Sequence, residues 1–308
     1  NLKVLMPFCF YFVFFFILGT IIGSFLNVVI DRADTNESPL KGKSHCFYCH
    51  KTLVWWEMVP VLSYFFLKGR CSLCKKKIPR QYPVVEFVSG LIFALLFWRF
   101  SKFYFFNLIF SGAFSWEKVL IFFDLVLWFY WASVLIAISV YDFKKYLILN
   151  QVLLPAIVIS FFWKIFLGVV AKFNPSFFLL NSFLRTNFLG DKNYLFGNYS
   201  FFISLALGII SFGGTISLIS WLTEEKAMGW GDALLAFFLG IILGWPNSLL
   251  ALIFSFLIGG VVSFFAIIAR KKTMKSYLPF APFLSIASLT IVLFGDIIIK
   301  GYLSILLI

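Results

Sequence analysis

Two aspartates, Asp142 and Asp232, each stand where a long apolar run meets a polar, basic segment. A carboxylate at membrane depth is costly, and such residues usually serve a function. If two carboxyl groups share one site, both cannot ionise cheaply, so one keeps a proton while the other acts as a base. Such a pair can activate water and polarise a peptide carbonyl, which is the chemistry of an aspartic peptidase.

Each aspartate also has a purely structural explanation. Asp142 could be an ordinary charge at the end of a helix, paired with Lys144 or Lys145, and Asp232 could be a helix N-cap. Glycines beside Asp232 let a second backbone come close, either a neighbouring helix or an extended peptide substrate. The residues expected to line the cleft are Gly229, Trp230 and Gly231.

The composition identifies the environment of these residues. The chain has 308 residues, of which 62% are hydrophobic and 21% aromatic, more apolar surface than a soluble domain can bury. Charged residues cluster between apolar runs of about 20 residues, the length that crosses a bilayer, and the short alternating segments of a β-barrel are absent. We expect an all-α polytopic membrane protein with about eight transmembrane helices. Spans are predicted near residues 7–30, 83–100, 119–141, 147–170, 199–222, 232–245, 248–269 and 280–299, with an interfacial segment at 103–114.

The basic residues predict the orientation. If eight spans cross the bilayer, residues 31–82, 142–146, 223–231 and 270–279 share one side, and 17 of the 26 Lys and Arg residues fall there. The positive-inside rule makes that side cytoplasmic and places both aspartates at the cytoplasmic face. Two other Gly-Asp pairs, Gly190-Asp191 and Gly295-Asp296, fall on the opposite side. The same rule accounts for the net charge of +13, so the expected partner is the lipid bilayer and not a nucleic acid.

The cytoplasmic loop 31–82 carries two Cys-x2-Cys pairs with 21 residues between them. Two such pairs can complete a tetrahedral site with four thiolate ligands, which is closed and therefore structural. The alternative, two disulfides, does not suit a reducing compartment. We expect structural Zn²⁺ to order a loop too polar to form its own core. The predicted ligands are Cys46, Cys49, Cys71 and Cys74.

Further motifs give the chain a family resemblance. They are Gly23-Ser24-Phe25-Leu26-Asn27-Val28-Val29-Ile30, the two cysteine pairs, Arg80-Gln81-Tyr82-Pro83-Val84-Val85-Glu86, Gly229-Trp230-Gly231-Asp232 and Pro279-Phe280-Ala281-Pro282-Phe283. In this order and at these spacings they resemble the bacterial type IV prepilin peptidases, membrane aspartic proteases with a GxGD motif. The resemblance covers nearly the whole chain. It predicts three segments: 1–30 as the first transmembrane helix, 31–82 as the zinc-binding loop and 83–308 as the peptidase core.

The resemblance also implies residue roles, substrates and a second activity. Asp142 and Asp232 match the family's catalytic pair, and the four loop cysteines match its zinc ligands. The family removes the basic leader of type IV prepilins and type II secretion pseudopilins at the cytoplasmic face of the bacterial inner membrane. Many members then methylate the new N-terminus with S-adenosylmethionine. No Gly-rich nucleotide loop marks a site for that cofactor here, so its use rests on the resemblance alone.

The chain departs from the family pattern at four positions. Trp230 stands where Gly is frequent and would crowd the cleft if it points inward, Ala233 replaces a common Lys, Ala281 a Gly and Asn150 an Asp. Two other functions remain open at this point. A proton- or ion-coupled transporter could use the two aspartates, although inverted repeats and broken helices are not evident. A non-catalytic scaffold could present the zinc module.

Overall fold

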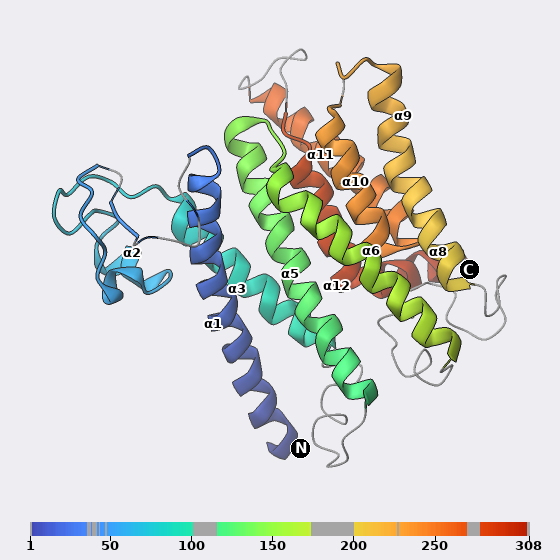
Figure 1. The fold of residues 1–308 in the computed structure, drawn as a ribbon, viewed down its shortest axis with the longest axis horizontal. Helices are drawn as coiled ribbons and strands as arrows, with labels where there is room; N and C mark the ends of the chain where they lie inside the picture. The colour runs from blue at the N-terminus through green and yellow to red at the C-terminus, as the bar shows by residue number, and fades with distance from the viewer. Residues whose placement is uncertain are drawn as a thin grey trace. The chain divides into compact units, whose positions relative to one another are not determined.

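The computed structural model describes residues 2–35, 38, 42, 44–46, 48–100, 116–173, 200–226, 228–269 and 278–306. Within these ranges the chain is helical and contains no strand, only two isolated bridges, His45 with Thr52 and Arg70 with Lys77 (Figure 1). Six helices are long and apolar enough to cross a membrane, and two shorter apolar helices, Trp230–Leu243 and Ala281–Gly295, correspond to the two remaining predicted spans. The predicted all-α membrane architecture is confirmed. The predicted interfacial segment 103–114 lies outside the described residues.

Two compact units divide the chain, Asn1–Phe106 with Phe122–Ala137, and Asn107–Ile121 with Ile138–Ile308. The first contains α1 (Leu2–Arg32), the short helices η1 (Trp55–Met58) and α2 (Leu62–Phe66), and α3 (Gln81–Phe100). It also contains the middle of α5 (Trp116–Lys145). The second unit holds the end of α5, then α6 (Asn150–Phe173), α8 (Ser200–Ile209), the π-helix η3 (Ile210–Gly214), α9 (Thr215–Leu222), α10 (Trp230–Leu243), α11 (Asn247–Ile268) and α12 (Ala281–Leu306).

Small residues let α1 and α3 pack closely in the first unit. A Cβ added at Gly19 would lie 2.6 Å from the carbonyl oxygen of Ser89, and one at Gly23 would lie 2.8 Å from the Cα of Glu86. Close approach through small residues is the usual way in which helices associate in lipid. Phe93 stacks on Phe129 with ring centroids 4.5 Å apart, which adds the middle of α5 to this pair of helices.

Helix α10 is the buried centre of the second unit. Its residues from Leu235 to Leu243 are buried, Phe237 excepted, and it packs against α6, α8, η3 and α12. A Cβ at Gly240 would lie 2.6 Å from the carbonyl oxygen of Gly208, so α8 and α10 approach at backbone distance. Because α10 is enclosed along its length, its first turn is held in place, and that turn carries Asp232.

Candidate functional site: a paired carboxylate and a four-cysteine cluster

Asp232 lies in the first turn of α10. The N-cap of this helix is Gly229, with an extended backbone (φ −78, ψ 159), so Asp232 occupies the third helical position. The alternative interpretation of Asp232 as an N-cap is therefore wrong. The backbone N–H of Gly229 hydrogen-bonds to the Asp232 carboxyl group, which is half of a capping box. The first turn of a helix also favours a negative charge, because its N–H groups point outward.

Gly231 brings this turn against the connection between α5 and α6. A Cβ at Gly231 would lie 2.7 Å from Cγ1 and 2.9 Å from Cβ of Ile148, both shorter than ordinary contact distances. Gly229 differs, because a Cβ there would meet nothing closer than the Gly231 nitrogen, at 3.9 Å. One glycine of the motif therefore serves packing within the protein, while the other leaves open space beside Asp232. Trp230, which would crowd the cleft if it pointed inward, is 48% exposed.

Asp142 lies in the last turn of α5 and is only 5% exposed. Its Oδ2 accepts a hydrogen bond of 3.1 Å from the backbone N–H of Ala281, a residue 139 positions away and the first of α12. The carbonyl of Phe280 accepts the first bonds of this helix, and Pro282 has no N–H. The Ala281 N–H is thus one of the helix-start donors that lack an intrahelical partner. A backbone donor does not depend on the side chain, so Ala in place of the family's Gly preserves it.

The second unit brings the two aspartates near enough for the charge of Asp232 to act on the carboxyl group of Asp142. Each is held by a backbone N–H at a helix start, Ala281 for Asp142 and Gly229 for Asp232. The comparison pair Gly190-Asp191 lies outside the described residues. Two carboxyl groups in one low-dielectric site can hold a single proton between them, which provides an acid and a base together.

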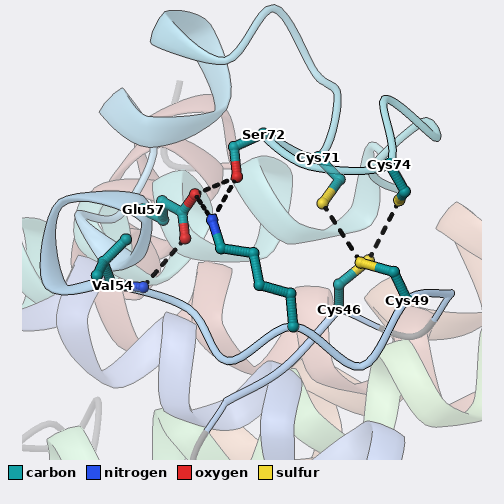
Figure 2. Close-up of polar contacts among 8 residues, drawn as sticks. Cys46, Cys49, Val54, Glu57, Cys71, Ser72 and Cys74 are labelled. Atoms are coloured by element: carbon teal, nitrogen blue, oxygen red, sulfur yellow. Dashed lines mark hydrogen bonds and ion pairs between the residues drawn. The ribbon is translucent and has the colours of Figure 1, made fainter.

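The four loop cysteines form a cluster. Their Sγ atoms all lie within 4.8 Å of one another, with 3.9 Å between Cys46 and Cys74 and 4.0 Å between Cys49 and Cys71 (Figure 2). These separations are about twice the roughly 2.05 Å of a disulfide bond. They are close to the ~3.8 Å edge of a tetrahedron with Zn–S bonds of about 2.3 Å. The donor set therefore fits a tetrahedral metal ion.

Each cysteine pair occupies a tight turn of the same design. The N–H of Cys46 donates to the Lys51 carbonyl and that of Cys71 to the Lys76 carbonyl, at 3.0 and 2.9 Å. In both turns the residue after the second cysteine, His50 or Lys75, has a positive φ. Backbone N–H groups of Cys74 and Leu73 point at the Cys71 sulfur and lower the pKa of that thiol to about 6. The turn thus favours the thiolate that a metal requires at Cys71, whereas burial and the three neighbouring sulfurs raise the pKa of Cys74 to about 11.

A partly buried polar contact joins the two turns, and sequence reasoning missed it. Lys51 Nζ lies 2.8 Å from Glu57 Oε1 and donates to Ser72 Oγ at 2.7 Å, while Ser72 Oγ donates to Glu57 (Figure 2). The Val54 N–H donates to the other Glu57 oxygen at 3.0 Å. Burial acts to raise the pKa of Glu57, but these donors outweigh it and hold the pKa below its ordinary value. Lys51 follows the first cysteine pair and Ser72 lies within the second, so the contact fixes their relative position.

Comparison with known proteins finds two family models and several relatives that match the chain. The model of the bacterial peptidase A24 N-terminal domain matches residues 17–100, and that of the type IV leader peptidase family matches 128–264. A protein of Stutzerimonas stutzeri named prepilin leader peptidase/N-methyltransferase is 27% identical over 93% of this chain and 92% of its own length. A protein of the same name from Bacillus subtilis is 29% identical over 94% of this chain and 96% of its own length. One from Myxococcus xanthus is 43% identical, over 29% of this chain and 27% of its own length.

No solved structure shows significant similarity to the chain. The two family models follow one another along the sequence: the first contains all four clustered cysteines, and the second contains both Asp142 and Asp232. The chain belongs to the type IV leader peptidase family.

Proposed function

We propose that this protein is a membrane aspartic endopeptidase that removes the leader peptide from type IV prepilins or type II secretion pseudopilins. The family membership supports the activity, as do the names of the relatives. The observation that carries the proposal is the electrostatic interaction between Asp142 and Asp232. In the proposed organisation, residues 1–30 form the first span, 31–82 the zinc-binding loop and 83–308 the peptidase core.

In this mechanism the two carboxyl groups begin with one proton. The ionised carboxylate removes a proton from water, whose oxygen attacks the scissile carbonyl carbon, while the protonated carboxyl hydrogen-bonds to the carbonyl oxygen. Collapse of the tetrahedral intermediate breaks the C–N bond, and a proton passes to the leaving nitrogen. The products are the leader's new carboxyl terminus and the new amino terminus of the pilin. Bonds from Ala281 and Gly229 would keep the two carboxyl groups oriented through these steps.

The position of the pair suits a substrate that crosses the membrane boundary. A prepilin has a basic leader followed by a hydrophobic helix, so the helix would lie among the spans while the leader remains in the cytoplasm. Asp142 lies in the last turn of α5 and Asp232 in the first turn of α10, which puts both near the ends of apolar helices. We place this end at the cytoplasmic face of the bacterial inner membrane, on the distribution of basic residues. Open space beside Gly229 would admit the extended backbone of the scissile segment.

A second activity, N-methylation of the new amino terminus, is also part of the proposal. It rests on the names of the relatives, which couple leader peptidase with N-methyltransferase. The methyl donor would be S-adenosylmethionine. The four-cysteine cluster would hold a structural Zn²⁺ through Cys46, Cys49, Cys71 and Cys74, and the ion would order the loop. No observation favours the transporter, because the family is one of peptidases.

The test is a cleavage assay on purified protein in proteoliposomes with a prepilin substrate. Asp142→Asn and Asp232→Asn should each abolish cleavage while the protein keeps its helical content. Asp124→Asn is the matched control, since Asp124 is buried on the same helix as Asp142 but belongs to neither position of the pair. Mass spectrometry of the product locates the cut and detects an added methyl group. Leader removal by either Asn variant at the wild-type rate would disprove the catalytic assignment.

A further inference from the structure

The loop between α1 and α3 exposes a large apolar surface. We call it the η1–α2 surface, because it consists of side chains from those two short helices, which contact each other. Their exposed fractions run from 42% to 79%. Phe14 and Ile17, on the transmembrane helix α1, are exposed by 51% and 53%, so these loop residues are as uncovered as those of a membrane-spanning helix. The η1–α2 surface comprises Trp55, Trp56, Met58, Leu62, Phe65 and Phe66.

A hydrogen bond joins the start of α2 to Glu86, a residue inside α3. The backbone N–H of Val61, the residue before α2, donates to Glu86 Oε2 at 2.6 Å. α3 begins at Gln81, so Glu86 lies five residues into the helix, about 7.5 Å at a rise of 1.5 Å per residue. Val61 holds a positive φ of 62°, which is unfavourable for a β-branched residue, and the bond to buried Glu86 keeps it there. The start of α2 is therefore beside the span, not beyond its end.

Helix α1 also places Glu86 inside the membrane-spanning segments rather than beyond their ends. Gly23 contacts Glu86, since a Cβ at Gly23 would lie 2.8 Å from the Glu86 Cα. Gly23 precedes the end of α1, at Arg32, by nine residues, or about 13.5 Å. It also lies well inside the candidate membrane span Cys9–Arg32.

Basic side chains complete the pattern. After α2, residues 67–80 carry six exposed basic residues and no acid, and the one acid of η1, Glu57, is buried and paired with Lys51. Aromatic and aliphatic side chains next to Lys and Arg are the composition of segments that lie in a membrane interface and bind anionic headgroups. The exposed basic residues are Lys68, Arg70, Lys75, Lys76, Lys77 and Arg80.

We propose that the η1–α2 surface inserts into the headgroup and upper acyl region of the bilayer that α1 and α3 span. The basic residues that follow it would contact anionic lipid headgroups. An interfacial helix typically reaches about 5–10 Å into this boundary, which agrees with the position of Glu86 about 7.5 Å along α3. The four-cysteine cluster, on the same loop, is then held at the membrane surface instead of extending into the cytoplasm. This inference depends only on α1 and α3 being membrane spans, and not on the peptidase activity.

The experiment uses the full-length protein in vesicles of phosphatidylethanolamine and phosphatidylglycerol. In three separate variants, the photocrosslinker p-benzoylphenylalanine replaces one residue. Phe66 tests the η1–α2 surface, Phe14 is a lipid-facing control on α1, and Lys226 is an exposed control in the loop after α9. After illumination, mass spectrometry measures lipid adducts. We expect the lipid-adduct yield at the Phe66 position to lie within roughly twofold of the yield at the Phe14 position. The yield at the Lys226 position should be at least about tenfold lower than at Phe14.

Two results would overturn the proposal. One is a Phe66 adduct yield as low as that at Lys226, and the other is crosslinking of Phe66 mainly to a second copy of the protein. A triple variant, Lys75→Gln, Lys76→Gln and Lys77→Gln, tests the basic residues separately. It should lower the phosphatidylglycerol share of the Phe66 adducts about twofold or more and leave that of Phe14 unchanged. An unchanged share at Phe66 would refute the headgroup contact.

Discussion

The two glycines of the Gly229-Trp230-Gly231-Asp232 motif should respond differently to the same substitution. In Gly231→Ala, the new methyl group would lie 2.7 Å from Cγ1 of Ile148. Carbon atoms pack at about 3.5–4.0 Å, so the first turn of α10 and the α5–α6 connection must separate by roughly 0.8 Å. Asp232 follows directly in that turn, and the α5–α6 connection follows the last turn of α5, which carries Asp142. The substitution therefore displaces the two carboxyl groups relative to each other.

The expected cost has two parts. Overpacking of this kind destabilises a protein by about 1–3 kcal/mol, even though Ala is otherwise the better helix former. A displacement of about 1 Å in a catalytic group can lower the rate roughly 10²-fold. Cleavage of a prepilin in proteoliposomes measures the rate, and thermal unfolding measures the stability. Replacing Ile148 by Ala in the Gly231→Ala background removes the contacting atoms and should restore much of the rate.

Gly229→Ala is the matched control for this prediction. A Cβ there would meet only the Gly231 nitrogen at 3.9 Å, and the backbone φ of −78 suits any residue. Its unfolding temperature should equal that of the wild-type protein. The steric argument fails if Gly231→Ala cleaves at the wild-type rate, or if Gly229→Ala destabilises the protein to the same extent.

Three more substitutions test the site. Ala281→Pro removes the N–H that binds Asp142, at a helix position that Pro can occupy. Loss of this hydrogen bond to a carboxylate, worth about 1.5–3 kcal/mol, should slow cleavage roughly 10–100-fold. The Ala281→Gly variant keeps the N–H and should cleave at the wild-type rate. Cys71→Ser should abolish stoichiometric zinc, measured by elemental analysis of the purified protein, and retained zinc would exclude this cysteine as a ligand. Glu57→Gln should weaken zinc binding about tenfold or more in chelator competition, because the two cysteine turns lose their connection. Glu224→Gln, which alters an exposed ion pair, is the control and should leave zinc affinity unchanged. Equal losses of zinc affinity in the two Gln variants would contradict the role of Glu57 in positioning the cysteine turns.

Much of the fold could be predicted because the helices are long and apolar. The predicted spans at 83–100 and 248–269 correspond to α3 (Gln81–Phe100) and α11 (Asn247–Ile268), with ends that differ by no more than two residues. Charge and hydropathy along a single segment are enough for such predictions, since each span must satisfy its own backbone in lipid. The cysteine cluster was equally accessible, because metal ligands in paired turns have characteristic spacing.

The residues that surround the two aspartates could not be predicted from the sequence in the same way. The Ala281 N–H that binds Asp142 comes from a segment 139 residues away, and the Pro279–Phe283 motif gave no indication of that role beyond its presence. Ile148 is an unremarkable apolar residue in the sequence, although it explains why Gly231 has no side chain. The structural explanation of Asp232 as an N-cap was wrong for a related reason: the helix begins earlier, at Trp230, because the buried body of α10 sets its register.

The sequence by itself determined the membrane-spanning class, the four clustered cysteines and the two aspartates worth pairing. These are properties of composition and spacing, which are local. Only the tertiary structure decided that Asp142 and Asp232 interact, which backbone groups orient them, and how deep Val61 and α2 lie beside α3. The physical reason is that such contacts depend on how closely helices pack, and in this chain that closeness is set by glycines such as Gly23 and Gly231, each facing a residue far along the sequence.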